Sequence, residues 1–276
     1  NMPINFSDQQ KEQFEAEGYL IVENFISDTT VDELRKLVIG MANYEMSEGQ
    51  SYIYPFDKSG LTQRVWNLTN KNHRFRELLE IEELSEIMNF IFRRPTSHQL
   101  FHLSSFQANI LHPGAERQKL HVDTPFPEPL PPWPAKANSI WLLDDFTEQN
   151  GATEIVPRSH INTNKPTIED DKFINCKKTI APRGSVLFTH GNLWHRAGAN
   201  LSDKPRIGLL GSFAASYMKE IASEEDQSLV VSQEVKANAS QRLSAILGLG
   251  HGIKEGALTS HDEKTPASNF NYNHSI

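Results

Sequence analysis

A histidine and a carboxylate stand two positions apart in the segment Lys119-Leu120-His121-Val122-Asp123. On an extended strand, residues two apart point to the same face, so the His121 imidazole and the Asp123 carboxylate would leave the backbone together. Imidazole and carboxylate suit iron and related divalent metals. The pair predicts two ligands of a metal site that takes its third ligand from elsewhere in the chain.

Two histidines further along the chain, His190 and His195, are candidates for the third ligand. Both lie where an apolar strand runs into a predicted hairpin. Arg206 follows His195 at the head of the apolar strand 207–210. An antiparallel return of the chain would bring the Arg206 guanidinium beside the metal, and His190 has no such partner. His195 is therefore favoured.

The combination of these residues indicates a particular chemistry. Two histidines and one carboxylate on one face of an octahedral ion leave three positions open, as in non-haem Fe(II) oxygenases. A 2-oxo acid would fill two of these positions and leave the third for O2. An arginine at the floor of the pocket would bind the distal carboxylate of that acid. The residues predict an Fe(II)- and 2-oxoglutarate-dependent oxygenase that releases succinate and CO2.

Composition restricts the class of protein. With 38% hydrophobic and 22% charged residues, the chain of 276 residues resembles ordinary globular domains. The net charge of −8, without a dense basic cluster, argues against nucleic-acid binding. The longest apolar stretch, 207–218, is too short to cross a bilayer, so no membrane anchor is expected. Cys176 is the only cysteine, so no internal disulfide is possible and a cytoplasmic location is expected.

The elements that must position these residues can be read from periodicity. Apolar residues recur at steps of three and four in 28–41 and 73–93, which predicts two helices, and a third begins near Phe6 and leads to a strand at 19–22. Beyond Pro95, clusters of Pro and Gly separate predicted strands at 98–111, 137–144, 153–156, 177–181, 185–189 and 206–216. Because no long helical pattern separates these strands, a β-sandwich or barrel is favoured over a parallel sheet.

Four segments occur in an order and spacing that are hard to obtain by chance: FEAEGYLIV at 14–22, the His121–Asp123 pair, the stretch from Asn150 to His160, and LWHRAGAN at 193–200 followed by Arg206. Together they resemble the phytanoyl-CoA dioxygenase-like (PhyH) branch of the Fe(II)/2-oxoglutarate oxygenases, over roughly residues 6–247. The resemblance implies iron on His121, Asp123 and His195, and the distal 2-oxoglutarate carboxylate on Arg206. It also implies a mainly β fold with flanking helices around a double-stranded β-helix (jelly-roll, cupin-like) core.

One domain over residues 1–247 is expected on this basis. It would contain a helical part at 6–95, the jelly-roll core at 96–218 and a closing helix at 228–247, with a polar tail at 248–276. Residues 43–64 are polar and aromatic, which is typical either of a loop over a pocket or of a plain surface loop. A homodimer through the terminal helices or the tail is an open alternative to a monomer.

Strand parity predicts further side chains at the cofactor site. Gln107 and Asn109 share one face, so either amide is expected to reach 2-oxoglutarate, with Asn109 preferred. The strand position at which family members often have a polar or Trp contact to 2-oxoglutarate is Ile140 here, and Trp141 has the opposite parity. Ala197, two positions after His195, is expected at the same site.

Residues for substrate recognition are predicted from aromatic and basic side chains near the pocket. A substrate lid is expected to contain Phe56, Trp66, Phe126 and Trp133, with aromatic packing under a loop as the alternative. Three arginines are candidates for an anionic group of the substrate: Arg64, Arg117 and Arg158. Because halogenating relatives lack the carboxylate ligand, Asp123 argues against halogenation.

The predicted reaction is hydroxylation or another oxidation of an aliphatic C–H in a small molecule. Desaturation, epimerisation and ring formation are alternatives on the same iron centre, because the pose of the substrate decides among them. A non-catalytic metal-binding jelly-roll module is a second reading, against which Arg206 argues. A protein side-chain hydroxylase is a third, and it would need an open groove in place of a covered pocket.

Overall fold

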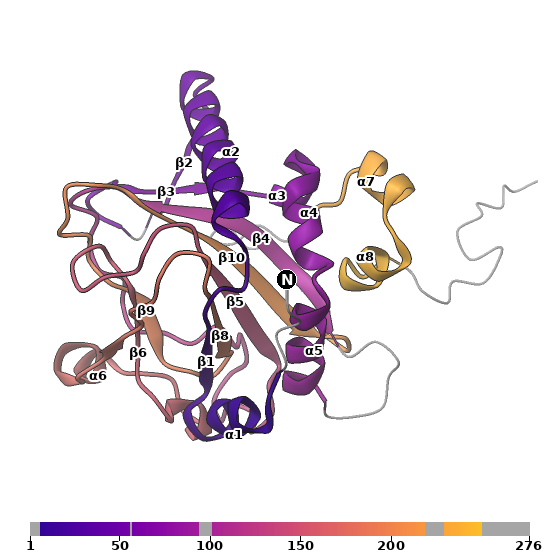
Figure 1. The fold of residues 1–276 in the computed structure, drawn as a ribbon. Helices are drawn as coiled ribbons and strands as arrows, with labels where there is room; N and C mark the ends of the chain where they lie inside the picture. The colour runs from indigo at the N-terminus through magenta and orange to yellow at the C-terminus, as the bar shows by residue number, and fades with distance from the viewer. Residues whose placement is uncertain (1–5, 56, 94–100, 219–228, 250–276) are drawn as a thin grey trace, which may run out of the picture.

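The computed structural model describes residues 6–55, 57–93, 101–218 and 229–249 (Figure 1). Its main feature is a seven-stranded sheet with the order β1-β8-β5-β10-β4-β3-β2. A second sheet has the order β7-β6-β9, and every strand pair in both sheets is antiparallel. The strands are β1 (Tyr19–Val22), β2 (Tyr52–Ile53), β3 (Thr62–Val65), β4 (Phe101–Leu111), β5 (Lys136–Leu142), β6 (Thr153–Ile155), β7 (Lys177–Lys178), β8 (Val186–His190), β9 (His195–Ala197) and β10 (Arg206–Ala215).

Most of the helices precede β4 or follow β10. They are α1 (Asp8–Glu17), α2 (Asp28–Ser47), α3 (Leu68–Lys71), α4 (His73–Leu79), α5 (Glu82–Ile91), η1 (Ser159–Ile161), α6 (Ile168–Phe173), α7 (Gln233–Asn238) and α8 (Gln241–Ile246). In Figure 1, α2, α4 and α5 lie along the large sheet, and α7 and α8 lie beside α4. The predicted mainly β fold with flanking helices is confirmed.

The apolar stripe of α2 fixes this helix to the sheet. Val31, Leu34 and Val38 are fully buried and belong to the same core cluster as Phe106 of β4 and Phe188 of β8. The helix begins at a Ser27 cap, whose hydroxyl accepts the Thr30 N–H at 3.2 Å. The same cluster takes apolar residues from α4, α5 and α8, so one core joins the helices to the outer face of the sheet.

The turn between α1 and β1 requires a glycine. Gly18 ends α1 with φ of 81°, a left-handed conformation that suits glycine. A Cβ at this position would lie 2.5 Å from the Nδ1 atom of His160. The close approach brings η1 against the N-terminal segment, where His160 Nε2 lies 3.0 Å from the Glu15 carbonyl oxygen.

Several predicted elements differ from the observed ones, and the strand expected at 177–181 is only the two-residue β7. The helix expected over 73–93 is interrupted at Glu80, whose carbonyl accepts a hydrogen bond from Arg242 of α8 at 3.0 Å. The closing helix expected over 228–247 is two short helices, because Ala239 is extended and Ser240 starts α8 by capping Leu243 N–H. The loop expected from residue 43 begins later, since α2 continues to Ser47, and it contains β2 and β3. The tail from 250 onward lies outside the described residues.

Successive residues of β10 point alternately into the apolar core and into a cavity on the other face of the sheet. Ile207, Leu209 and Phe213 belong to the large apolar cluster. Arg206 and Ser212, which have the opposite parity, line a cavity together with residues of β6 and β9 in the second sheet. The inner face of the large sheet is thus available for a polar site.

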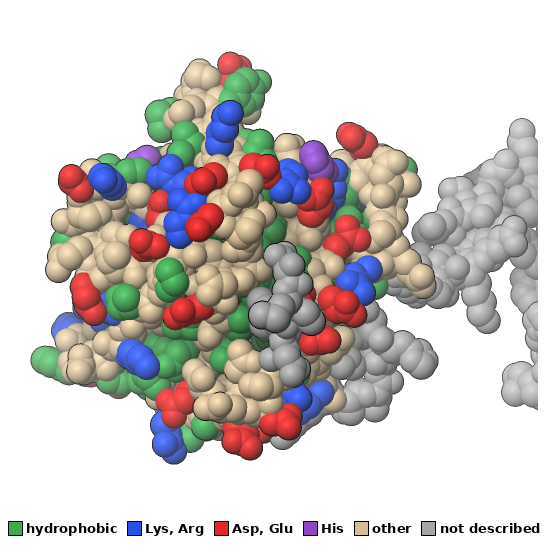
Figure 2. All heavy atoms as spheres, viewed as in Figure 1, with side chains coloured by type: hydrophobic (Ala, Val, Ile, Leu, Met, Phe, Trp, Pro, Cys, Tyr) green, Lys and Arg blue, Asp and Glu red, His purple; other side chains and the backbone are tan. Residues whose placement is uncertain are grey.

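The surface carries mixed charges. On the face shown in Figure 2, Lys and Arg side chains alternate with Asp and Glu, and green apolar side chains stand at the projecting end of α2, where Tyr44 and Met46 are exposed. Within the described ranges, no helix combines the length and the apolar character that crossing a bilayer requires.

Loss of the α2 anchor should destabilise the fold. Leu34→Ala removes a fully buried side chain from the core and should lower the free energy of unfolding by about 2–5 kcal/mol. Leu201→Ala, at a side chain that is 72% exposed, is the matched control and should change it by less than about 0.5 kcal/mol. Urea unfolding followed by circular dichroism measures both, and equal effects would contradict the assigned core.

Candidate metal centre

A backbone bridge brings the candidate ligands together. The His121 N–H donates to the His195 carbonyl at 3.0 Å, and the His195 N–H donates to the His121 carbonyl at 3.0 Å. The Gly191 carbonyl accepts the N–H groups of Asp123 at 2.9 Å and Thr124 at 3.1 Å. Two segments far apart in the sequence are therefore joined by main-chain hydrogen bonds at the predicted ligands.

Both imidazoles are oriented by carbonyl oxygens two residues upstream. His121 Nδ1 lies 2.8 Å from the Lys119 oxygen, and His195 Nδ1 lies 2.8 Å from the Leu193 oxygen. If each Nδ1 carries the proton, it donates a hydrogen bond to its carbonyl. The lone pair of each Nε2 is then free to bind a metal. The Nε2 atoms lie 3.8 Å (His121) and 3.3 Å (His195) from the Asp123 carboxylate. One ligand atom from each residue lies within 4.8 Å of the others, which suits a single ion.

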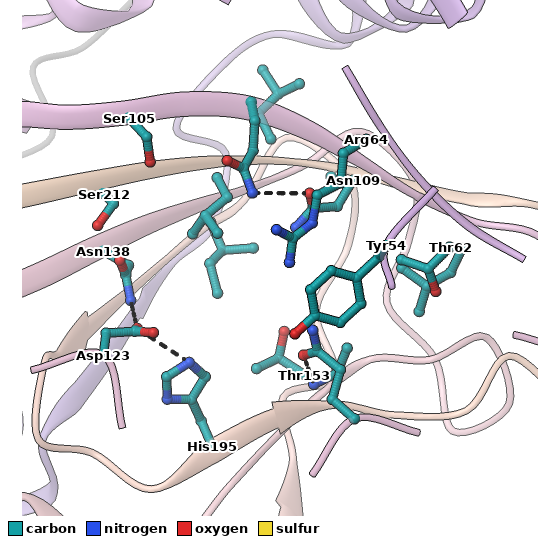
Figure 3. A pocket seen from close by; sticks show the side chains of 18 of the residues that line it. Tyr54, Thr62, Arg64, Ser105, Asn109, Asp123, Asn138, Thr153, His195 and Ser212 are labelled. Carbon is teal, nitrogen blue, oxygen red and sulfur yellow. Dashed lines mark hydrogen bonds and ion pairs between the residues drawn. The ribbon is translucent and has the colours of Figure 1, made fainter. Parts of the chain in front are cut away.

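The Asp123 carboxylate is held by an amide from the large sheet. Asn138 Nδ2 on β5 donates to Asp123 Oδ2 and also to Thr189 Oγ1 at 3.3 Å (Figure 3). Burial raises the pKa of Asp123, but His195, His121 and Asn138 outweigh it and hold the pKa below its ordinary value. Burial, aided by His195, lowers the pKa of His121. Both shifts favour the protonation states that bind metal, an ionised carboxylate and a neutral imidazole.

Arg206 provides a buried positive charge at the end of the cavity. Its side chain is nearly fully buried, donates to the Gly151 carbonyl through Nη2 and lies 4.3 Å from the centre of the Phe146 ring. Its Nε has no hydrogen-bond partner among the described residues. Burial lowers the pKa of Arg206 to about 10, with Asp144 opposing the shift, so the group is still charged at neutral pH.

The space beside Arg206 is kept open by a glycine. A Cβ at Gly208 would lie 3.5 Å from Arg206 Nη1. A carboxylate placed there would meet a desolvated guanidinium that forms no ion pair within the described part of the chain, which is a favourable environment for an anion.

The cavity contains most of the predicted site residues. Its volume is about 270 Å³, and its walls include His121, Asp123 and His195 as well as Arg206. The four further positions predicted at the cofactor site also line it: Gln107, Asn109, Ile140 and Ala197. Gln107 Nε2 donates to Asn109 Oδ1 at 3.3 Å (Figure 3), so one amide orients the other.

Apart from Arg64, several polar residues of the cavity were not predicted. Arg64 was one of three candidate arginines, and it lines the cavity with its guanidinium 4.0 Å from the centre of the Tyr54 ring, whereas Arg117 and Arg158 are exposed. The others with polar side chains are Tyr54, Thr62, Ser105, Gln118, Asn138, Thr153 and Ser212. Asn138 lies two positions before Ile140 and Ser212 lies six positions after Arg206, so each shares a strand face with a predicted site residue. Strand parity could therefore have placed both in the cavity wall. Thr62 and Arg64 lie on a short strand inside a polar segment that has no clear periodic signal.

The predicted aromatic lid does not line this cavity. Trp133 is 44% exposed and its indole N–H donates to the Tyr217 hydroxyl at 2.9 Å. Trp66 is buried against Tyr52, with ring centres 5.6 Å apart. Phe126 is half-buried and also lies outside the cavity wall. Trp133 and Trp66 thus have contacts of their own, and Phe56 lies outside the described residues.

His190, the rejected ligand candidate, has a different environment. It is buried, its ring centre is 5.3 Å from that of His160, and its Nδ1 accepts the Asn192 N–H at 3.0 Å. Burial, together with His160, lowers the pKa of His190 to about 3. The side chain therefore stabilises the turn at 190–192, in which the Gly191 carbonyl accepts the Asp123 N–H.

Comparisons with known proteins give a consistent result. The family model described as phytanoyl-CoA dioxygenase (PhyH) matches residues 14–208. Dioxygenase af480 of Aspergillus fumigatus is 28% identical over 277 residues, covering 97% of this chain and 85% of the relative. Multifunctional dioxygenase prhA of Penicillium brasilianum is 24% identical, covering 87% of this chain and 82% of the relative.

Solved structures show the same fold. The non-haem alpha-ketoglutarate-dependent carbocyclase SnoK from nogalamycin biosynthesis has a TM-score of 0.63 at 18% identity, covering 82% of this chain and 97% of its own. The epimerase SnoN, in complex with Fe3+, alpha-ketoglutarate and nogalamycin RO, has a TM-score of 0.62 at 14% identity, covering 82% and 96%. The predicted jelly-roll core is confirmed.

Removal of a candidate ligand should abolish metal binding without unfolding the chain. His195→Ala should weaken Co(II) binding at least about a hundredfold, because an imidazole at the bridge is lost. His112→Ala removes a half-buried imidazole that contacts Gln63 and should leave the affinity unchanged. Anaerobic calorimetric titration measures both affinities, and a near-normal value for His195→Ala would contradict the assignment.

Removal of the Asn138 amide should have a smaller effect on the same affinity. Asn138→Ala frees the Asp123 carboxylate and should weaken Co(II) binding roughly tenfold. Thr189→Val deletes the other contact of the amide but keeps its bond to Asp123, so it serves as the control. If both variants bound metal equally well, the amide would have no part in holding the carboxylate.

Proposed function

Because the chain belongs to the phytanoyl-CoA dioxygenase (PhyH) family, we propose that it oxidises an aliphatic C–H of a small molecule at a centre held by His121, Asp123 and His195. The chain is a non-haem Fe(II)/2-oxoglutarate-dependent dioxygenase, with O2 as the second cosubstrate. The site-specific roles, the substrate class and the type of oxidation are the proposed parts.

The donor set fits Fe(II). Two neutral imidazole nitrogens and one carboxylate face a common point, and each is fixed by a hydrogen bond from or to a neighbour. Fe(II) bound there would supply the activation of O2, which amino-acid side chains do not provide. The task of the three side chains is to bind the ion on one face and keep the other face open to the cavity.

The charges of the cavity fit a dicarboxylate. We assign the distal carboxylate of 2-oxoglutarate to Arg206, whose unpaired Nε and neighbouring Gly208 leave a place for it. Arg64 lies in register with Asn109 and Gly208, near Arg206, and faces the cavity in Figure 3, so it would add a second positive charge for the diacid. Asn109 and Gln107 would donate amide hydrogen bonds to the same molecule.

A small-molecule substrate is supported by the size of the site. A cavity of about 270 Å³ is close to the lower limit of about 300 Å³ for small-molecule pockets, which favours a small molecule over a peptide. SnoK and SnoN are a carbocyclase and an epimerase of nogalamycin biosynthesis, and prhA is a multifunctional dioxygenase. Hydroxylation, desaturation, epimerisation and ring closure therefore all stand as outcomes of this proposal, and substrate pose selects among them.

The observation that carries the proposal is the buried Arg206 guanidinium in the same cavity as the His–Asp–His cluster. A module that only binds metal does not need such a group, because burying a cation is costly unless a ligand or residue pairs with it.

Replacement of Arg206 should separate cosubstrate binding from metal binding. Arg206→Met should weaken 2-oxoglutarate binding roughly 10- to 100-fold, because charge-assisted hydrogen bonds are lost, while Fe(II) affinity changes little. Arg183→Met removes a surface arginine paired with Asp28 and Asp32 and is the control. Anaerobic titration of the Fe(II)-loaded protein, followed by visible absorption of the chelate, gives the affinity. Equal affinities in the Arg206→Met variant and the parent protein would overturn the assignment.

A further inference from the structure

A row of small polar side chains crosses the inner face of the large sheet. Ser212 on β10 lies directly opposite Ser105 on β4 and Asn138 on β5, and Asn138 lies opposite Thr189 on β8. Four adjacent strands therefore contribute neighbouring side chains to one line. Ser105, Asn138 and Ser212 line the cavity.

This row lies away from the Arg206 end of the cavity. Ser212 and Arg206 share one face of β10 and are six positions apart, which corresponds to roughly 20 Å of strand. In Figure 3, Ser105, Ser212 and Asn138 lie on the side of Asp123, whereas Arg64, Tyr54 and Thr62 lie on the other. A five-carbon diacid bound to Arg206 is too short to occupy the row as well.

The amide of the row is used within the protein, but the two hydroxyls are not. Asn138 donates to Asp123 and Thr189. Ser105 and Ser212 are buried, 5% and 8% exposed, and although their main chains belong to the sheet, their hydroxyls make no hydrogen bond to any described residue. Nearby serines are different, because Ser104 accepts from Lys136 Nζ at 2.9 Å and Ser139 accepts from the Trp141 indole at 3.0 Å.

Two buried hydroxyls without a protein partner facing a cavity need a ligand or solvent to hydrogen-bond. Each hydroxyl donates one hydrogen bond and accepts others, so the pair suits a hydroxyl or carbonyl oxygen. The apolar side chains Ile140 and Leu210 form the next row of the same wall and would contact the carbon skeleton.

We propose that Ser105 and Ser212 form a substrate-orienting subsite that hydrogen-bonds a hydroxyl or carbonyl oxygen of the substrate and so determines which C–H faces the metal. The substrate class is then an oxygen-bearing small molecule with an apolar skeleton, not a plain hydrocarbon chain. This inference rests on the proposed function, since it places the remainder of the substrate beside the His–Asp–His cluster.

The test compares ketones with the corresponding hydrocarbons. The probes are three pairs of increasing size: cyclohexanone and cyclohexane, camphor and camphane, and androstan-3-one and androstane. Binding to the anaerobic Fe(II)- and 2-oxoglutarate-loaded protein is measured by paramagnetic broadening of the probe proton resonances, which also reports proximity to the iron. The proteins are the parent chain, the S105A/S212A variant and the control Ser139→Ala, which deletes a buried serine hydroxyl on the opposite face of β5.

The parent chain should bind the ketone of at least one pair about tenfold more tightly than its hydrocarbon, the scale of one or two neutral hydrogen bonds. This preference should disappear in S105A/S212A and persist in Ser139→Ala. A preference that survives in S105A/S212A, or the lack of any preference in the parent chain, overturns the proposal. If S105A/S212A folds poorly by circular dichroism, each single variant is compared, and a preference unchanged in both likewise overturns it.

The same samples separate this proposal from the proposed function. The visible band of the Fe(II)–2-oxoglutarate chelate is recorded before each probe is added. Its absence in the parent chain contradicts the proposed function, whereas an intact band with an unchanged ketone preference in S105A/S212A contradicts only the serine subsite.

Discussion

The reciprocal backbone bridge between His121 and His195 is the constraint on which the site depends. Two N–H···O bonds of 3.0 Å make these residues a hydrogen-bonded antiparallel pair, which brings their Cα atoms to about 5.5 Å. Their ring centres are consequently 4.5 Å apart, and Asp123 is placed next to them by the Gly191 carbonyl. Main-chain hydrogen bonds thus fix positions that side-chain packing alone would leave variable, and the local carbonyls then set the direction of each imidazole.

The large sheet serves two purposes with alternating residues. One face of β10 is buried under the helices through Ile207, Leu209 and Phe213, so the strand is anchored by apolar contacts. The other face presents Arg206, Gly208 and Ser212 to the cavity. Core residues and cavity-lining residues alternate on the same strand. Close packing of the core residues therefore also holds the cavity-lining residues in place. The polar groups at the two ends of this wall differ, a guanidinium at one end and hydroxyls at the other.

The parts of the site that were predictable are those set by local geometry. Asp123 follows His121 by two positions, and strand parity links Gln107 to Asn109 without knowledge of the fold. His195 was distinguished from His190 by Arg206, whose strand does return into the same cavity. The place of Arg64 in the cavity wall depends instead on the pairing of β3 with β4, which puts Arg64 opposite Asn109. A four-residue strand within a polar segment gives no periodic signal from which this pairing could be predicted. At the break after α4, Ile81 is extended and the Glu80 carbonyl accepts a hydrogen bond from Arg242, which lies far along the chain.

The proposed centre holds iron on His121, Asp123 and His195 and binds the distal carboxylate of 2-oxoglutarate at Arg206. The most direct test is an anomalous difference map, measured at the iron absorption edge, from crystals of the protein grown anaerobically with Fe(II) and 2-oxoglutarate. We expect one strong peak between the three side chains, and electron density for the diacid that ends at the Arg206 guanidinium. A peak at other residues, or a diacid turned away from Arg206, would contradict this proposal.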